Sequence, residues 1–194
     1  MIKEKVILVD CDGVLLDWAY SFNQWMARHG YKEVRTDTYH IDNRYDIDRD
    51  ESRKLVRMFN ESAWIRKIPP LRDAIKYVKK LHQDHGYIFH AITSLSNDDY
   101  AQHLRTKNLI ELFGPTAFER YTYLDTGADK DEALAIYADS ECYWVEDKPE
   151  NAYVGSKVGL TPILVDHEHN RDVKDVFNYE RVQNWKEIYE IIVG

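Results

Sequence analysis

Two aspartates, Asp10 and Asp12, directly follow the apolar run Val6-Ile7-Leu8-Val9, with Cys11 between them and Gly13 after them. A continuous, mostly β-branched run of this kind favours a strand that is buried on both faces of a parallel sheet. Side chains alternate along an extended chain, so the two carboxylates can point to one side while Cys11 points away from them. Ligands of open α/β sheets bind beyond the carboxyl ends of the strands. Two acids at this place predict a metal site, or a nucleophile with an acid/base partner.

Three later segments of the chain also contain polar residues that could take part in binding or catalysis. Thr93 and Ser94 offer hydroxyls that could hold phosphate oxygens together with nearby backbone N–H groups. Lys130 offers a positive charge, and Glu146 and Asp147 are adjacent acids where a metal ligand would belong. Each of these residues alone is common in turns and helix caps. Each lies at the end of a predicted strand or at the start of the next helix, and such a series is unlikely to arise by chance.

The elements between these residues must bring them together. Apolar runs after the first strand predict four more strands, over residues 87–92, 120–124, 141–145 and 161–165. Amphipathic spacing predicts one helix over 71–85 and another over 130–137. A further helix follows the polar turn at 93–98 and ends near Lys107, and a last one contains Trp185, Ile188 and Ile191. This alternation of strands and helices predicts an α/β fold, in which a parallel sheet is covered by helices on both faces.

The proline pair Pro69-Pro70 separates two kinds of sequence pattern. Before it, aromatic and polar residues occur at helical spacing, whereas the regular alternation of helices and strands begins after it. We therefore predict an α/β core made of residues 1–16 and 70–194, and a small helical cap made of residues 17–69 that is inserted after the first strand. The predicted cap consists of a helix over 17–30, an irregular polar stretch over 31–50, and a helix over 51–59 with Asp50 or Ser52 as its N-cap.

Composition limits the partners of the protein. With 194 residues, 44% of them hydrophobic and 31% charged, the chain is long enough for one folded domain with a modest insertion. The net charge of −8 argues against a general grip on long nucleic acid, and no apolar run approaches the roughly 18 residues that cross a membrane. Cys11 and Cys142 are the only cysteines, too few for a disulfide framework. Because the first residues also lack a signal-peptide pattern, we expect a cytoplasmic protein with reduced thiols.

The four motifs together resemble those of the haloacid dehalogenase (HAD) superfamily of phosphotransferases. The matching residues, in the order of the superfamily's motifs, are Asp10-Cys11-Asp12-Gly13, Thr93, Lys130 and Glu146-Asp147. The resemblance covers about residues 1–16 and 70–194. It implies a Rossmann-like, three-layer α/β/α core with a parallel sheet, to which the helical cap is added.

The resemblance also implies a role for each residue. Asp10 would be the nucleophile, and Asp12 would be the general acid and base. Thr93 and Lys130 would hold the phosphoryl group, with the Ser94 hydroxyl beside them. Mg²⁺ would be bound by Asp10, by the backbone carbonyl of Asp12, and by Asp147.

Two positions depart from the pattern of that superfamily. Glu146 replaces a common Asp or Gly, and Asn151 stands where many relatives have a second acid. Support for the metal through these two positions is therefore in doubt, and Asp147 is expected to be the main ligand on that side.

A narrower resemblance is to the 5′(3′)-deoxyribonucleotidases of the superfamily. It rests on Asp12-Gly13-Val14-Leu15-Leu16-Asp17-Trp18 and on the segments 60–62, 69–71, 92–94, 112–115, 145–149 and 184–188. This resemblance implies that the partner is a small phosphorylated molecule, a nucleoside monophosphate, and that Phe22 and Trp64 lie near its base. Each of these rings could stack on a pyrimidine, or could instead belong to the hydrophobic core of the cap.

Other functions stay open at this point. The same core could act on a sugar phosphate or another small metabolite, or on the phosphorylated ends of DNA or RNA. A non-catalytic scaffold protein is disfavoured because it would not need Asp10, Asp12, Lys130 and Asp147 together. The sequence indicates no particular oligomeric state.

Two further polar clusters are interpreted as surface features. The segment Asp46-x-Asp48-x-Asp50 begins like an EF-hand loop, but Glu51 occupies the position that requires glycine. We predict a solvated acidic turn there. The segment His167-Glu168-His169 could bind a metal, but we predict a polar surface loop.

Overall fold

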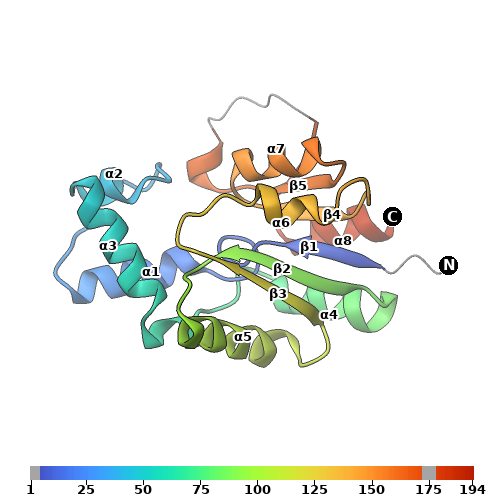
Figure 1. Cartoon of the computed structure of the whole chain (residues 1–194), viewed down its shortest axis with the longest axis horizontal. Coiled ribbons are helices and arrows are strands. Elements are labelled where there is room, and N and C mark those ends of the chain that lie inside the picture. The colour runs from blue at the N-terminus through green and yellow to red at the C-terminus, as the bar shows by residue number, and fades with distance from the viewer. Residues whose placement is uncertain (1–4, 172–177) are drawn as a thin grey trace.

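A six-stranded sheet forms the centre of the protein (Figure 1). The computed structural model describes residues 5–171 and 178–194, so residues 1–4 and 172–177 of the predicted core lie outside the described residues. All neighbouring strands are parallel, in the order β3-β2-β1-β4-β5-β6. The strands are β1 (Val6–Val9), β2 (Ile88–Ser94), β3 (Phe118–Leu124), β4 (Tyr143–Glu146), β5 (Thr161–Val165) and β6 (Glu180–Val182).

Alternation along β1 feeds the two faces of the sheet. Ile7 and Val9 pack into a large core on one face, and Leu8 packs into a smaller core on the other. All three side chains are fully buried, as expected of a central parallel strand with helices on both sides. The predicted parallel α/β fold is confirmed. The sequence analysis missed β6, because two of its three residues are charged and no apolar run marks it.

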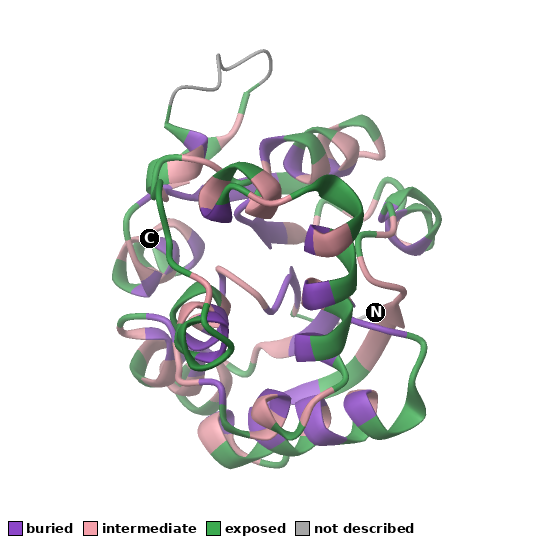
Figure 2. Ribbon diagram, turned by 90° about the vertical axis from the view of Figure 1, so that its left-hand side faces the viewer, coloured by how far each residue is buried: buried purple, intermediate pink, exposed green. Residues whose placement is uncertain are grey.

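Helices cover the sheet and turn their buried residues inward (Figure 2). In the α/β core they are α4 (Ala74–His85), α5 (Asp99–Phe113), α6 (Asp131–Ala135), α7 (Pro149–Lys157), α8 (Trp185–Val193) and the 3-10 turn η2 (Glu168–Asn170). Helix α7 and turn η2 lack an apolar stripe long enough to be predicted. Helix α4 begins three residues later than predicted, because Arg72 has a φ of 45° and residues 71–73 form a turn.

The cap lies beyond the carboxyl ends of the strands, at the left of Figure 1. It contains α1 (Trp18–Arg28), α2 (Ile41–Tyr45), α3 (Arg49–Asn60) and the 3-10 turn η1 (Ala63–Lys67). Helix α2 falls in the stretch that was expected to be irregular. The chain enters and leaves the cap side by side: the Asp17 N–H donates to Pro69 O over 2.9 Å, and the Leu71 N–H donates to Leu15 O over 2.8 Å.

Aromatic rings pack the interior of the cap. Phe22 is stacked on Trp18 with 4.5 Å between ring centroids, and it meets Phe59 edge-on at 5.3 Å. Trp25 and Tyr45 also pack against Phe22. Aromatic pairs of this geometry stabilise a core beyond their buried area. The interior of the cap therefore packs around aromatic rings that are continuous with the large core on one face of the sheet.

Three contacts attach α3 to the core. Arg57 forms an ion pair with Asp125, at 3.0 Å, in the loop after β3. Asn60 donates to the Leu95 carbonyl over 3.0 Å, and Ser96 donates to Glu61 over 2.6 Å. These contacts hold the C-terminal end of α3 against the loops that follow β2 and β3, so that α3 forms a wall opposite the strand ends.

The acidic turn before α3 caps two helix ends. Asp46 ends α2 with a φ of 52°, and the Asp48 side chain accepts from the Glu51 N–H over 2.8 Å. The N-cap of α3 is therefore Asp48, not Asp50 or Ser52 as predicted, because the helix begins two residues earlier than its apolar spacing indicates.

Within residues 5–171 and 178–194, no helix is both long enough and apolar enough to cross a membrane.

The Asp48→Ala substitution should lower the free energy of unfolding by about 1 kcal/mol, because the Glu51 N–H loses its acceptor. Asp50→Ala is the matched control, since the Asp50 side chain is 94% exposed and meets only Arg53 at 3.7 Å. Urea unfolding followed by circular dichroism compares the two variants. A loss for Asp50→Ala as large as that for Asp48→Ala would contradict the assignment of the cap.

Candidate active site

A cleft of about 1020 Å³ lies between the cap and the carboxyl ends of the strands. In this strand order the topological switch point lies beside β1, which is where ligands of open α/β sheets bind. The predicted site residues that line the cleft are Asp10, Asp12, Thr93, Ser94, Lys130 and Asp147. Segments far apart in the sequence are thus brought to one place.

Lys130 joins the ends of β1 and β4. Its Nζ lies 3.0 Å from Asp10 Oδ2 and 2.8 Å from Glu146 Oε2, and all three side chains are buried. Burial alone lowers the pKa of Lys130, but the two carboxylates outweigh it and raise the pKa above its usual value. The charged ammonium therefore reduces the repulsion between two buried acids.

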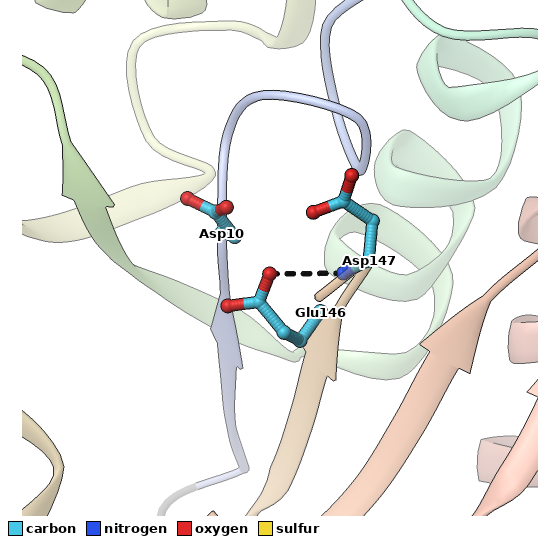
Figure 3. Close-up of side chains that lie close together, drawn as sticks. All are labelled: Asp10, Glu146 and Asp147. Atoms are coloured by element: carbon cyan, nitrogen blue, oxygen red, sulfur yellow. Dashed lines mark hydrogen bonds between the residues drawn. The ribbon is translucent and has the colours of Figure 1, made fainter. Parts of the chain in front are cut away.

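Glu146 is held by four donors. Figure 3 shows its hydrogen bond from the backbone N–H of Asp147. Its Oε1 accepts from the backbone N–H groups of Asp147, over 2.9 Å, and Lys148, over 3.1 Å. Its Oε2 accepts from Lys130 and from the Asn151 side chain, over 3.2 Å. Burial raises its pKa well above the usual value in spite of Lys130. Glu146 therefore orients Lys130 and the start of the loop after β4, and Asn151 supports Glu146.

Two histidines surround Asp147. His169 Nε2 lies 3.5 Å from Asp147 Oδ2, and His167 Nε2 lies 2.7 Å from the Gly13 carbonyl. Burial raises the pKa of Asp147, but His169 and His167 outweigh it, so the pKa is lowered on balance. The prediction of a polar surface loop at 167–169 is wrong. The end of β5 brings this segment beside the end of β4, a proximity that no local pattern indicates.

Three carboxylates converge at the floor of the cleft. Asp10, Glu146 and Asp147 each place one oxygen within 4.8 Å of the others. Carboxylate oxygens are suitable ligands for Mg²⁺. Each oxygen of Glu146 already accepts from two donors, whereas each oxygen of Asp10 has one partner, and Asp147 Oδ2 contacts His169. Asp10 and Asp147 are therefore the members of this group with oxygen lone pairs left for a cation. The donor set fits the predicted metal.

Asp12 is paired with a buried arginine that the sequence analysis missed. Arg105 Nη1 lies 2.9 Å from Asp12 Oδ1, and the Arg105 side chain has no exposed surface. Burial raises the pKa of Asp12 to about 6, although Arg105 opposes the shift. A signal for Arg105 exists in the sequence. Arg105 interrupts the buried stripe of α5, which also contains Ala101, Leu104 and Leu109.

The two hydroxyls after β2 differ in their surroundings. Thr93 is 1% exposed, and its Oγ1 makes no hydrogen bond within the described part of the chain. A buried polar atom without a partner indicates a ligand that completes it. Ser94 instead donates to the Ala128 carbonyl over 2.9 Å and so fixes the loop that leads to Lys130. Its donor is therefore not available to a phosphate oxygen.

The predicted aromatic residues do not face the cleft. Phe22 has no exposed surface and is enclosed by the other rings of the cap. Trp64 lines a separate depression on the cap, where the Arg28 guanidinium lies 5.0 Å from its ring centroid. Phe22 packs inside the cap, and Trp64 packs beside Arg28 in the separate depression, so neither ring lies at the strand ends.

Other aromatic rings line the cleft. Trp18 is fixed by the hydrogen bond from its Nε1 to Asn60 Oδ1, over 3.0 Å. Tyr39, in the loop before α2, is 50% exposed and meets the His169 ring edge-on at 5.3 Å. Lys148 Nζ lies 5.7 Å from the Tyr39 ring centroid. These two rings face the cleft from the cap.

The sequence model of one protein family matches residues 4–194, almost the whole chain. This family is described as 5′ nucleotidase, deoxy (pyrimidine), cytosolic type C protein. The chain belongs to this family. The expected resemblance to HAD phosphatases of the deoxyribonucleotidase type is confirmed, and the protein is a phosphoric monoester hydrolase.

Four proteins illustrate what this nucleotidase-family protein is similar to. An uncharacterized 32.4 kDa protein of Enterobacteria phage T4 is 24% identical over 195 residues, which cover 95% of this chain and 68% of the phage protein. A predicted phosphatase from Clostridium acetobutylicum has a similar structure, with a TM-score of 0.65 at 13% identity over 98% of both chains.

Two further structures share the fold. A haloacid dehalogenase-like hydrolase from Streptococcus pneumoniae has a TM-score of 0.64 at 15% identity, over 99% of this chain and 100% of the other. A putative HAD hydrolase from Bacillus subtilis, which was solved bound to magnesium, has a TM-score of 0.62 at 13% identity, over 97% and 98% of the chains.

The Gly13→Ala substitution should lower the melting temperature and displace Asp147. Gly13 has a φ of 75°, and a Cβ built on it would overlap with Asp147 Oδ2. Gly86→Ala is the matched control, because Gly86 has a φ of 70° but an added Cβ would meet no atom within 4 Å. Both variants carry a backbone strain of roughly 1–2 kcal/mol.

Thermal unfolding should show a larger decrease in melting temperature for Gly13→Ala than for Gly86→Ala. Equal losses would mean that Asp147 moves away without cost, which would contradict a tightly packed floor of the cleft.

Proposed function

We propose that this phosphatase is a Mg²⁺-dependent enzyme that hydrolyses nucleoside monophosphates through an aspartyl-phosphate intermediate. The observation that supports this most is the group formed by Asp10, Lys130 and Thr93 on one side of the cleft. It combines a carboxylate nucleophile, a buried cation 3.0 Å from it, and a buried hydroxyl without a partner. Such a group suits an anion that brings its own oxygens.

Asp10 is the nucleophile in this proposal. One oxygen of its carboxylate forms a bond to phosphorus, while the bond between phosphorus and the ester oxygen breaks. The backbone N–H of Cys11 donates to Asp10 Oδ1 over 2.7 Å and fixes the orientation of the carboxylate. Lys130 pairs with the other oxygen and lowers the repulsion between Asp10 and the phosphate dianion.

Asp12 is the acid and base in this proposal. In the first step it gives its proton to the departing ester oxygen, so that a neutral alcohol leaves. In the second step it takes a proton from water, which attacks the phosphorus and breaks its bond to Asp10, releasing inorganic phosphate. A pKa of about 6 allows Asp12 to serve in both directions near neutral pH. Arg105 keeps its carboxylate in place.

Mg²⁺ would be held by Asp10 and Asp147, with the backbone carbonyl of Asp12 as a further ligand expected from the superfamily. When bound, it would offset negative charge on the phosphoryl oxygens. The hydrogen bonds of Glu146 would keep Asp147 in position, and Glu146 itself would not bind the metal.

We further propose that Tyr39 and Trp18 contact the nucleoside, in place of Phe22 and Trp64. Both rings line the cleft from the cap, and Tyr39 is half-exposed. The stack of Phe22 on Trp18 supports this role indirectly, because it fixes the Trp18 ring. A sugar phosphate stays the alternative substrate, since the polar side chains of the cleft can also bind hydroxyls.

The Asp10→Asn substitution should reduce phosphate release by at least ~10³-fold, because the amide oxygen is a poor nucleophile. Asp46→Asn is the matched control, since Asp46 is exposed, lies outside the cleft, and has a left-handed φ that Asn tolerates. Release is measured with p-nitrophenyl phosphate and with a panel of nucleotides and sugar phosphates, in Mg²⁺ and in EDTA.

Wild-type activity that needs Mg²⁺ and favours nucleoside monophosphates would agree with the proposal. Near-wild-type activity of Asp10→Asn would rule out the aspartyl-phosphate, and a preference for sugar phosphates would rule out the nucleotide substrate.

The Tyr39→Ala substitution should raise KM for a nucleoside monophosphate by about 5- to 100-fold, as roughly 1–3 kcal/mol of stacking is lost. KM for p-nitrophenyl phosphate should change far less. Trp64→Ala is the matched comparison and should alter neither constant, because Trp64 lies outside the cleft. A selective rise of KM in Trp64→Ala, and none in Tyr39→Ala, would return the base contact to Trp64.

A further inference from the structure

A row of arginines on α3 faces the cleft from the cap. Arg49, Arg53 and Arg57 are spaced by four residues, so they lie on one side of the helix, and all three line the cleft. With a rise of 1.5 Å per residue, the row is about 12 Å long. We call these three residues the arginine row.

The members of the row differ in their partners. Arg57 is bound to Asp125 and Glu61, and this pairing attaches the cap to the core. Among residues 5–171 and 178–194, Arg53 pairs only with Asp50, at 3.7 Å, and their side chains are 65% and 94% exposed. An exposed helix pair of this kind is weak. Arg49 makes no hydrogen bond or ion pair within the described residues. Two guanidinium groups of the row are therefore available to a ligand.

The acids near this end of α3 do not neutralise it inside the cleft. Asp46, Asp48 and Asp50 are exposed and are absent from the cleft wall. Asp48 is occupied as the N-cap, accepting from Glu51. The cap wall also carries acids, among them Asp42 and Glu33, of which Glu33 is paired with Arg44. Arg49 and Arg53 therefore stand beside these acids and across from the carboxylates on the floor.

The arginine row and the proposed reaction site lie in the same cleft but on different walls. Lys130 and Thr93 belong to the floor, while Arg57 marks the end of the row that is nearest the core. Arg53 and Arg49 follow at increasing distance from that attachment. A cleft of about 1020 Å³ is at the upper limit of small-ligand sites, so it leaves room beyond a single phosphoryl group.

We propose that Arg49 and Arg53 bind a second phosphate of the substrate, while the scissile phosphate lies at Asp10. Guanidinium groups bind phosphate oxygens in pairs, which gives both affinity and orientation. The preferred substrate is then a nucleotide that carries two phosphates at separate positions. A nucleoside bisphosphate and the phosphorylated end of a short oligonucleotide share this chemistry. The inference rests on the proposed nucleotidase function and specifies its substrate.

The test compares phosphate release from thymidine 5′-monophosphate, thymidine 3′,5′-bisphosphate and the 5′-phosphorylated dinucleotide pTpT. The wild type should show a lower KM for the substrates with a second phosphate, and added salt should reduce this preference. In the Arg49→Ala/Arg53→Ala variant, KM for these substrates should rise about tenfold or more. Its KM for the monophosphate should change less than about twofold.

Lys54→Ala is the matched control. Lys54 is an exposed cation of the same helix, but it lies outside the cleft, so its removal changes net charge without touching the row. It should leave all three substrates unaffected. An equal effect of Lys54→Ala would show that only general charge is involved, and would overturn the proposal.

Thymidine 3′,5′-bisphosphate and pTpT distinguish the two possible sources of the second phosphate. A gain for the bisphosphate alone assigns the row to a free nucleotide, and a gain for pTpT assigns it to a strand end. No preference for either probe over the monophosphate, in a wild type that hydrolyses the monophosphate, would overturn this inference and leave the nucleotidase function standing.

A binding measurement tests the role of the arginine row independently of catalysis. Calorimetry with thymidine 3′,5′-bisphosphate and the Asp10→Asn variant needs no turnover. Adding Arg49→Ala and Arg53→Ala to that variant should weaken binding about tenfold or more. If the wild type releases no phosphate from any probe, the proposed function fails, and this measurement still decides about the row. Unchanged affinity would overturn it.

Discussion

The ion pair between Lys130 and Glu146 is the interaction on which the site depends. Strands β1 and β4 are neighbours, and each ends in acids that are buried at the floor of the cleft. In a medium of low dielectric constant, such carboxylates repel one another strongly. Lys130 contacts Asp10 and Glu146 at once, and backbone N–H groups satisfy the rest of Glu146. Lys130 therefore reduces the repulsion between the acids at the ends of these two strands.

The same logic explains why a buried arginine and two partly buried histidines lie around the other acids of the cleft. Arg105 offsets Asp12 from beneath, and His169 contacts Asp147 from the end of β5. Charge is balanced by residues from four different segments of the chain. Loss of one cation would leave a buried acid without a partner, which is more costly than removing both members of a pair. The site is thus an electrostatic unit, and no single motif is sufficient for it.

The cap supplies one wall of the cleft. Its aromatic residues serve two purposes: Phe22 and Phe59 pack its interior, whereas Trp18 and Tyr39 face the cleft. Contacts at the C-terminal end of α3 fix one wall of the cleft relative to the strand ends. The cap wall therefore presents both aromatic and cationic surface to the cleft.

The sequence by itself determined the parallel α/β fold and the residues at the strand ends. Continuous apolar runs followed by Asp10 or by Thr93 are local signals, because burial on both faces and a polar strand end are properties of a short segment. The short edge strand β6 and helix α7 lack such signals. The N-cap at Asp48 was missed because cap geometry is decided by the last backbone turn, two residues before the apolar spacing begins.

Only the tertiary structure decided which side chains meet. A helical pattern shows that Phe22 has an apolar neighbourhood, but it does not tell whether that neighbourhood is a core or a ligand. The same limit applies to His169 and Arg105, whose partners lie far away in the sequence. Their roles arise from the order of the strands, which brings β5 beside β4 and packs α5 beneath the loop after β1. Local chemistry is written in the residues, whereas contact between distant residues depends on how the whole chain packs.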